Sequence, residues 1–266
     1  MKTNFSFKEL SALLLLLCLS FSSGHAQWFH LPGFLQRYEI GYSYSIANAT
    51  YKSQYSNGAN GDTTLSKNVT STAGIGAQIG FTIPITRIGG KCMLALGLGY
   101  QYNMYTWDYK TPNFDGSYKD GDGNVIFDLS TISTSAASLQ MGLPISADFK
   151  FGNDAFLRKN QRWGCTFGAG VLPVAAVTAD FDNAGFGFGA APFVKAEVSF
   201  FAGICFKLRG QYAIGYLPFY DAQNSLGALT DYAVKSSLTG KQQMTFSLIL
   251  MPFSFAWQEH GWWNTY

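Results

Sequence analysis

Regular alternation of apolar and polar residues is the most constraining feature of this chain. In SLQMGLPISADFKFG, residues 138–152, every second residue is apolar and those between are small or polar. A period of two puts the two sets on opposite faces of a β-strand. The polar face carries Asp148 and Lys150, an acid and a base. The apolar face of such a strand must be kept away from water. It is hidden either in the core of a soluble protein or against the lipid of a membrane.

The same alternation recurs and predicts eight strands. The connections at 55–69, 109–133 and 218–241 are long, 180–189 is intermediate, and 86–91, 152–162 and 202–203 are short. Short turns at one end and long loops at the other are typical of outer-membrane barrels. We therefore predict an all-β fold, an eight-stranded antiparallel up-and-down transmembrane β-barrel. Its expected strands are 37–54, 70–85, 92–108, 134–151, 163–179, 190–201, 204–217 and 242–257.

Composition indicates which face meets lipid. Only 13% of residues are charged, whereas 17% are aromatic. A soluble ligand-binding barrel, the alternative, would expose a face of Gly, Ala, Ser and Gln with few charges to hydrate it. In a membrane barrel a lysine or arginine facing lipid at the midplane costs about 2–4 kcal/mol, so the charges belong inside. An eight-stranded bore is only wide enough to be filled by side chains.

The ends of the chain predict export. A basic start, an apolar stretch and the small residues at Gly24 to Ala26 have the form of a secretory signal cleaved after Ala26, with a retained anchor as the alternative. The expected organisation is a signal at 1–26, a periplasmic lead at 27–36, the barrel at 37–257 and an aromatic tail at 258–266. An even strand count places both termini in the periplasm and the long loops outside, in the outer membrane of a Gram-negative bacterium. The formal net charge of +2 offers no basic patch for nucleic acid.

Charged residues on the polar strand faces are expected to project into the lumen. Isolated charges in a narrow space of low dielectric constant are costly, so these groups should pair with one another. We favour a polar plug that closes the lumen; an ion path, a proton path or a gate is the alternative. The residues are Arg37, Glu39, Asp148, Lys150, Lys195, Glu197, Lys207 and Arg209.

These features together resemble the small OmpA/OmpX-type outer-membrane β-barrels. The stretch LQMGLPISADFKF looks like the fourth-strand region of barrel proteins of the Bacteroidota, including the PorT-like group tied to secretion. The resemblance is architectural and covers essentially the whole mature chain. It implies contact with outer-membrane lipids and a role as a structural or interaction protein, with a protein partner at the periplasmic rim or the external loops, in a larger envelope or secretion complex.

The sequence offers no catalytic constellation at the external rim. The mature chain has two histidines, His30 and His260, both expected at the periplasmic end, so a Ser/His pair is not available there. We therefore expect no enzyme; a small-solute channel and a lipid-modifying enzyme are the alternatives. The loop with Asp120, Asp122 and Asn124 departs from a calcium-loop pattern at later positions and is interpreted as a solvated turn. No metal or cofactor is expected.

Aromatic residues are expected to form a girdle at each rim, because Trp and Tyr are enriched at membrane interfaces. Exposed aromatic side chains also serve as anchors for protein partners. Cysteines 92, 165 and 205 start strands that are not neighbours, so no disulfide among them is expected. The periplasmic girdle comprises Trp28, Phe29, Trp257, Trp262 and Trp263, and the external one Tyr51, Tyr102, Tyr105, Trp107, Phe219 and Tyr220.

Overall fold

The computed structural model describes residues 35–57, 61–108, 117–119, 125–128, 135–179, 184–220 and 235–257. The expected signal at 1–26, most of the lead and the tail at 258–266 lie outside these residues. The described elements are η1 (Leu35–Arg37), β1 (Tyr38–Asn57), β2 (Gly61–Ile88), β3 (Cys92–Asp108), β4 (Ser117–Lys119), β5 (Val125–Asp128), β6 (Ser135–Gly142), β7 (Ile145–Gly152), α2 (Asn153–Phe156), β8 (Trp163–Ala179), β9 (Ala184–Ala202), β10 (Ile204–Tyr220), β11 (Lys235–Met251) and η4 (Pro252–Ala256).

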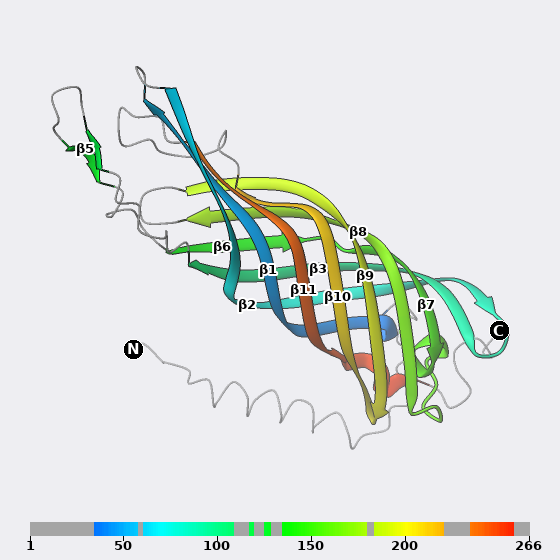
Figure 1. Ribbon diagram of the computed structural model, residues 1–266. Coiled ribbons are helices and arrows are strands. Elements are labelled where there is room, and N and C mark those ends of the chain that lie inside the picture. Colours follow the sequence, from blue (N-terminus) through cyan, green and yellow to red (C-terminus); the bar gives the residue numbers. More distant parts are fainter. Residues whose placement is uncertain are drawn as a thin grey trace, which may run out of the picture. The chain divides into compact units, whose positions relative to one another are not determined.

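The main sheet closes on itself. Its neighbouring strands pair antiparallel, and the first, β1, pairs with the last, β11, from Ile40 opposite Leu250 to Gln54 opposite Lys235. β6 and β7 act as two halves of one strand, because both pair with β3 on one side and with β8 on the other. The ring therefore has eight strand positions and is closed (Figure 1). This confirms the predicted fold, an all-β antiparallel up-and-down barrel.

One predicted strand, 134–151, is interrupted at its centre. Pro144 has no N–H to donate to a ladder, and the chain leaves the strand at Leu143 and Pro144. The neighbours compensate: Gly99 N donates to Pro144 O at 3.0 Å, and Leu143 N donates to Pro173 O at 2.9 Å. The break therefore bends the wall without opening it.

The predicted loop at 55–69 is wrong, because most of it continues β1 and β2. Their ladder runs to Asn57 opposite Gly61, so only 58–60 lie between them. β2 meets β3 first at Ser71 opposite Trp107, and the distal part of the β1–β2 hairpin therefore extends past β3 (Figure 1). The segment is polar on both faces, which hides the period of two.

Other strands are also longer than predicted. β9, β10 and β11 extend into the predicted connections 180–189 and 218–241, and β4 pairs with β5 within 109–133. The predicted last strand ends at Met251, where η4 begins, and α2 occupies part of 152–162. The shortest turns match prediction, with Gly89 at φ 63° and Gly203 at φ 83°, a conformation that favours glycine.

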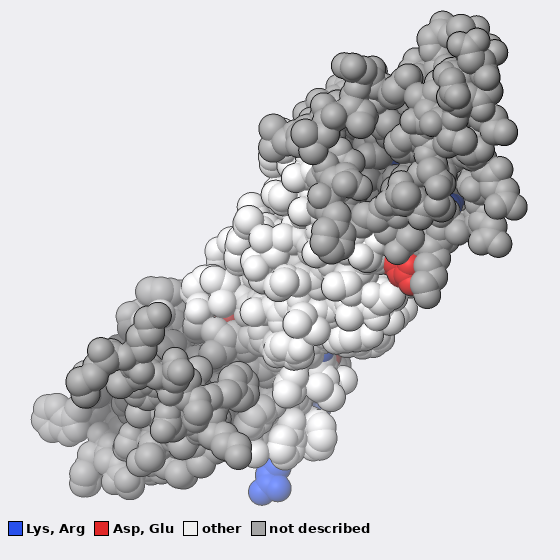
Figure 2. Space-filling model, turned by 90° about the vertical axis from the view of Figure 1, so that its left-hand side faces the viewer, with Lys and Arg blue, Asp and Glu red and all other residues white. Residues whose placement is uncertain are grey.

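The outer face of the barrel is apolar. Large side chains such as Ile83, Phe167, Val194 and Leu208 are 47%, 58%, 55% and 64% exposed. Figure 2 shows a broad band of described surface almost without charged atoms. Exposed apolar patches of this extent are foreign to soluble monomers, and an outward apolar band is the surface of a transmembrane barrel.

Among the described residues, no helix is long and apolar enough to cross a membrane.

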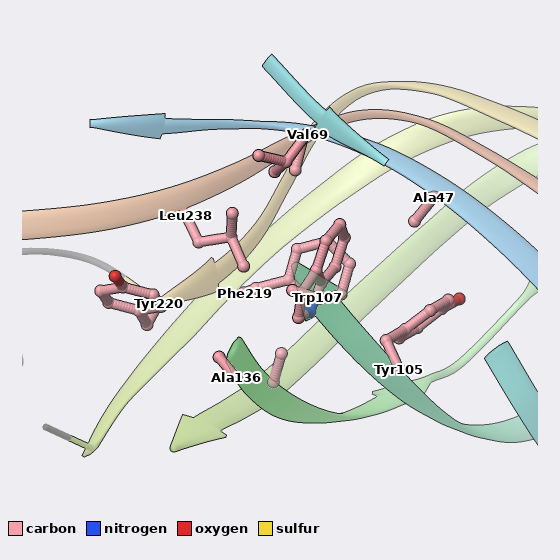
Figure 3. Packing of buried hydrophobic residues seen from close by; sticks show 10 residues of the cluster. Ala47, Val69, Tyr105, Trp107, Ala136, Phe219, Tyr220 and Leu238 are labelled. Atoms are coloured by element: carbon pink, nitrogen blue, oxygen red, sulfur yellow. The ribbon is translucent and has the colours of Figure 1, made fainter. Parts of the chain in front are cut away.

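At the loop end the interior is filled by an aromatic cluster. Tyr105 and Trp107 on β3 and Phe219 on β10 are at most 1% exposed. The Phe219 ring meets Trp107 edge-on, with centroids 4.7 Å apart, and Tyr105 at 5.3 Å (Figure 3). We call this set, with its neighbours, the aromatic plug. Its buried members are Ala47, Ala49, Val69, Tyr105, Trp107, Ala136, Ala176, Phe219, Tyr220 and Leu238.

The aromatic plug corrects the predicted external girdle. Tyr105, Trp107, Phe219 and Tyr220 point into the barrel, not toward the rim. The reason on β3 is parity: Tyr105 and Trp107 share the inward face with Gln101 and Asn103. Of the other two, Tyr102 and Tyr51 are half-buried, and Tyr51 packs against the plug.

Glycines on β9 let the end of β10 lie close against it. A Cβ at Gly187 would lie 2.9 Å from the carbonyl oxygen of Pro218, and one at Gly185 would lie 3.0 Å from Tyr220 Cβ. Thr178 on β8 donates its hydroxyl to Phe219 O at 3.3 Å. This close approach positions Phe219 inside the mouth of the barrel.

We expect Phe219→Ala to lower the free energy of unfolding by about 3–5 kcal/mol, because it leaves a cavity beneath Trp107. Urea unfolding in detergent micelles measures the loss. Phe188→Ala, at a lipid-facing position that is 66% exposed, is the control and should change stability far less. Equal losses in the two variants would contradict the interior position of Phe219.

Candidate functional site

A network of charged side chains fills the turn end of the barrel. Strand parity directs Lys207 and Arg209 of β10 inward, where Glu197 of β9 and Glu39 of β1 meet them. β7 contributes Asp148 and Lys150, and β9 contributes Lys195. The structure thus brings together, as ion pairs, the predicted lumen residues of four strands. We call this set, with Asp154 and Arg37, the charge network.

Lys207 is the hub of the network. Its Nζ lies 2.6 Å from Glu39 Oε1, 2.8 Å from Asp154 Oδ2 and 3.8 Å from Glu197 Oε2, and its side chain is fully buried. An ammonium has three donors and no acceptor, so carboxylates around it are the surroundings that stabilise it without water.

Arg209 joins the carboxylates on the other side. Its Nε donates to Glu197 Oε1 at 2.7 Å, and its Nη2 donates to Glu39 Oε2. The planar guanidinium therefore bridges two strands with charge-assisted bonds. Lys195 extends the chain of contacts, with Nζ 2.9 Å from Asp148 Oδ2 and 3.3 Å from Glu197 Oε1.

Asp154 is the central residue that the sequence analysis missed. It lies on α2, in the segment predicted as a short turn, and its Oδ2 accepts from Lys150 Nζ at 2.6 Å and from Lys207 Nζ at 2.8 Å. α2 enters the barrel because Ala155 and Phe156 pack with Met93 and Ala95 of β3. The predicted lumen set could have revealed a missing acid, because it contains five cations and only three acids. A buried network needs more negative charge than that.

Arg37 fixes α2 in place from η1, just before the strand in which it was predicted. It donates from Nη1 to Asp154 O at 3.0 Å and from Nη2 to Ala155 O at 3.1 Å. These are backbone carbonyls of the short helix, where cations bind favourably. Burial lowers the pKa of Arg37 to about 10, against the opposing effect of Asp154 and Glu39, so the group stays charged at neutral pH.

Asp154 is held ionised. Its complete burial would raise the pKa, but Lys150 and Lys207 outweigh that effect and hold the pKa of Asp154 below its ordinary value. The carboxylate therefore keeps its charge, and its ion pairs, through the neutral and mildly acidic range.

Three carboxylates of the network could in principle ligate a cation. Single oxygens of Glu39, Asp154 and Glu197 lie within 4.8 Å of one another, and all three residues are buried. Lys207 Nζ lies among them at ion-pair distances. The ammonium thus supplies the positive charge that a metal would bring, and these residues work as a structural ion cluster.

Polar side chains occupy the lumen between the charge network and the aromatic plug. Gln211 donates to Gln101 Oε1 at 3.3 Å, and Ser43 donates to Asn103 Oδ1 at 3.1 Å. A cavity of about 20 Å³, roughly the room of one water, is lined by Glu39, Lys195, Arg209, Gln211 and their neighbours. The described lumen is therefore filled at three successive levels.

Trp257 closes the turn end from inside, which corrects its place in the predicted periplasmic girdle. It is 1% exposed, stacks on Phe201 at 5.6 Å between centroids, and donates from Nε1 to Gln36 O at 3.2 Å. The other girdle candidates, Trp28, Phe29, Trp262 and Trp263, lie outside the described residues, as do His30, His260 and the acidic positions 120 and 122.

The cysteines of the barrel are free thiols. Cys205 is buried beside Leu157, Met251 and Trp257, whereas Cys92 and Cys165 are half-buried. They fill apolar space in the wall and at the turn end.

No protein-family model matches the chain. No curated protein matches its sequence. Among solved structures, the chain is similar to the outer membrane protease OmpT of Escherichia coli, with 7% identity and a TM-score of 0.39 over 83% of this chain and 98% of that one. It is also similar to Neisserial surface protein A (13%, 0.33, 79% and 96%). A third similar structure is Ail of Yersinia pestis (11%, 0.27, 79% and 98%). At these identities and scores, the fold rests on the strand pairing of this chain itself.

We expect Lys207→Met to lower the free energy of unfolding by about 3–5 kcal/mol, because it leaves buried carboxylates without their shared cation. Urea unfolding followed by tryptophan fluorescence measures the change. Lys241→Met, an exposed lysine at the loop end, is the control with little expected effect. A Lys207→Met variant as stable as the wild type would show that the hub contributes no net stability.

The contribution of Asp154 to stability should be visible in the pH dependence of unfolding. Because the folded-state pKa lies below the ordinary value of 3.8, the stabilisation from Asp154 is present above that value and is lost as pH falls below it toward the folded pKa. The expected result is a stability loss confined to strongly acidic pH. The Asp154→Asn variant should be less stable than the wild type at neutral pH, and its free energy of unfolding should fall less on acidification. A variant whose stability falls with pH as steeply as that of the wild type would contradict this.

Proposed function

We propose that this protein is an outer-membrane β-barrel that acts as a structural or interaction protein and neither transports solutes nor catalyses a reaction. The observation that carries the proposal is the filled lumen. The charge network, the polar layer and the aromatic plug occupy successive levels of the bore. A solute would have to displace buried ion pairs and a packed aromatic cluster to pass.

The surface distribution supports the membrane placement. Apolar side chains cover the wall, and the charges of the network point inward, as transfer costs require. In the proposed orientation the short turns at 89–91 and 203 face the periplasm, and the β1–β2 hairpin, with the longer connections, faces outward.

The β1–β2 hairpin is the surface best placed to meet a partner. Beyond Ser71, β2 has a described ladder partner on one side, β1, which leaves an edge that another strand can join. The described outer face there carries hydroxyl and amide groups, such as Asn48, Asn68 and Thr70, joined by hydrogen bonds. The resemblance to PorT-like barrels suggests that such a partner belongs to an envelope or secretion assembly.

The first test is electrical. Purified protein in planar lipid bilayers should give no steady conductance, because the bore is filled. Trp107→Ala, combined with Phe219→Ala, removes two rings of the aromatic plug and is the positive comparison for a loosened lumen. Steady conductance by the wild-type protein would replace the proposed function with that of a channel.

The second test concerns the hairpin. A photo-crosslinking residue at the exposed positions Ser66 or Asn68 should give a discrete protein adduct in native membranes, identified by mass spectrometry. The same residue at Val171, 49% exposed on the lipid-facing wall, is the control and should give no such adduct. Hairpin positions that behave like Val171 in a correctly assembled barrel would remove the hairpin as the partner surface.

A further inference from the structure

At the turn end, the charged side chains that the structure describes outside the lumen are all basic. Of the acidic side chains that the structure describes, Glu39, Asp148, Asp154 and Glu197 are buried, and Asp108 near the loop end is half-buried. Five other described cations at the turn end lie outside the charge network. They come from the end of β2, the β2–β3 turn and the β7–β8 connection, and they are Arg87, Lys91, Arg158, Lys159 and Arg162. We call these five the basic turn cluster.

Two guanidinium groups of the cluster are held on one ring. Arg87 Cζ lies 5.2 Å from the centroid of Phe156, and Arg158 Cζ lies 4.8 Å from it. Arg87 lies at the end of β2 and Arg158 in the β7–β8 connection. Near them, Gly152 N at the end of β7 donates to Lys91 O in the β2–β3 turn at 3.4 Å. Stacking of this kind orders a guanidinium without using its N–H groups.

Arg87, which is exposed, keeps donors for an anion. Arg87 uses Nε for Gly89 O at 2.8 Å. Its two Nη groups have no hydrogen-bond or ion-pair partner among the described residues, and none of the five cations of the cluster forms a salt bridge with a described acid. Paired arginine forks are well suited to phosphate oxygens.

The cluster lies at the border of the apolar wall. Arg87 is flanked by Ile85 and Ile88, which are 57% and 46% exposed, and Arg162 precedes Trp163, which is 63% exposed and stacks on Phe200. A ligand that meets these residues together has to be anionic at one end and apolar at the other. A soluble acidic peptide would leave the isoleucines and the tryptophan without a role.

We propose that the basic turn cluster binds the phosphate headgroups of anionic phospholipids in the membrane leaflet at the turn end. Arg87, Arg158 and Arg162 contact the phosphate, while Ile88 and Trp163 lie against the upper part of the acyl chains. The proposal rests on the membrane placement proposed above. It gives the barrel a preferred lipid shell at one end and holds α2, through Phe156, beneath the bound headgroups.

The experiment is native mass spectrometry of the detergent-purified full chain, titrated with phosphatidylglycerol or with phosphatidylcholine. The wild type should retain phosphatidylglycerol in preference. In the variant Arg87→Gln with Arg162→Gln, retention should fall on the order of tenfold, since each surface cation contributes to the attraction of anionic lipid. The matched control is Lys52→Gln with Lys241→Gln, two exposed lysines at the loop end, which should keep wild-type retention.

Three results would overturn the inference: equal retention of the two lipids by the wild type, an equal loss in the control variant, or full displacement of the lipid by inorganic phosphate. The last would identify a site for a free anion. Heat-modifiable electrophoretic mobility shows that each variant is folded. The bilayer conductance test is independent of this experiment. Conductance would contradict the proposed function, whereas a lack of lipid preference would contradict the lipid site.

Discussion

Charged groups inside a narrow bore need opposite charges or hydrogen-bond partners, and the rest of this structure is arranged around that requirement. An apolar outer wall leaves the lumen as the place for polar groups, and eight strands leave no room there for bulk water. Lys207 therefore lies among Glu39, Asp154 and Glu197, and Arg209 joins two of the same carboxylates from the other side. These groups come from β1, β9, β10 and α2, and the register of the closed ring brings them together.

The connection after β7 is part of this solution. Asp154 adds negative charge to that of Glu39 and Glu197 at the centre of the network, and it does so from a short helix folded into the barrel. Arg37 holds the carbonyl groups of that helix, and Met93 and Ala95 pack with Ala155 and Phe156. One segment thus closes the turn end, completes the ion pairs and supports the arginines that lie outside.

Sequence alone predicted the strands and their inward faces because alternation reports parity directly. The prediction failed where the sequence shows no alternation of apolar and polar residues. The β1–β2 hairpin is polar on both sides, so its extension past Ser71 had no signal, and Asp154 lies where no strand pattern reaches. For Tyr105 and Trp107 the alternation does indicate the inward face, since both share it with Asn103. The girdle prediction was wrong because it followed the general preference of aromatic residues for membrane interfaces.

The near-neutral charge of the whole chain conceals a separation of charge. At the turn end, the described acids lie in the lumen beside the cations of the charge network, and the five cations of the basic turn cluster form no salt bridge with a described acid. The same residues that stabilise the interior therefore define the exterior, because every carboxylate drawn into the bore is one fewer at the rim. Phe156 connects the two regions, because it packs with Met93 and its ring also contacts the guanidinium groups of Arg87 and Arg158. Among the described residues, the basic exterior of the turn end thus accompanies an interior in which the acids are used to pair with the cations of the charge network.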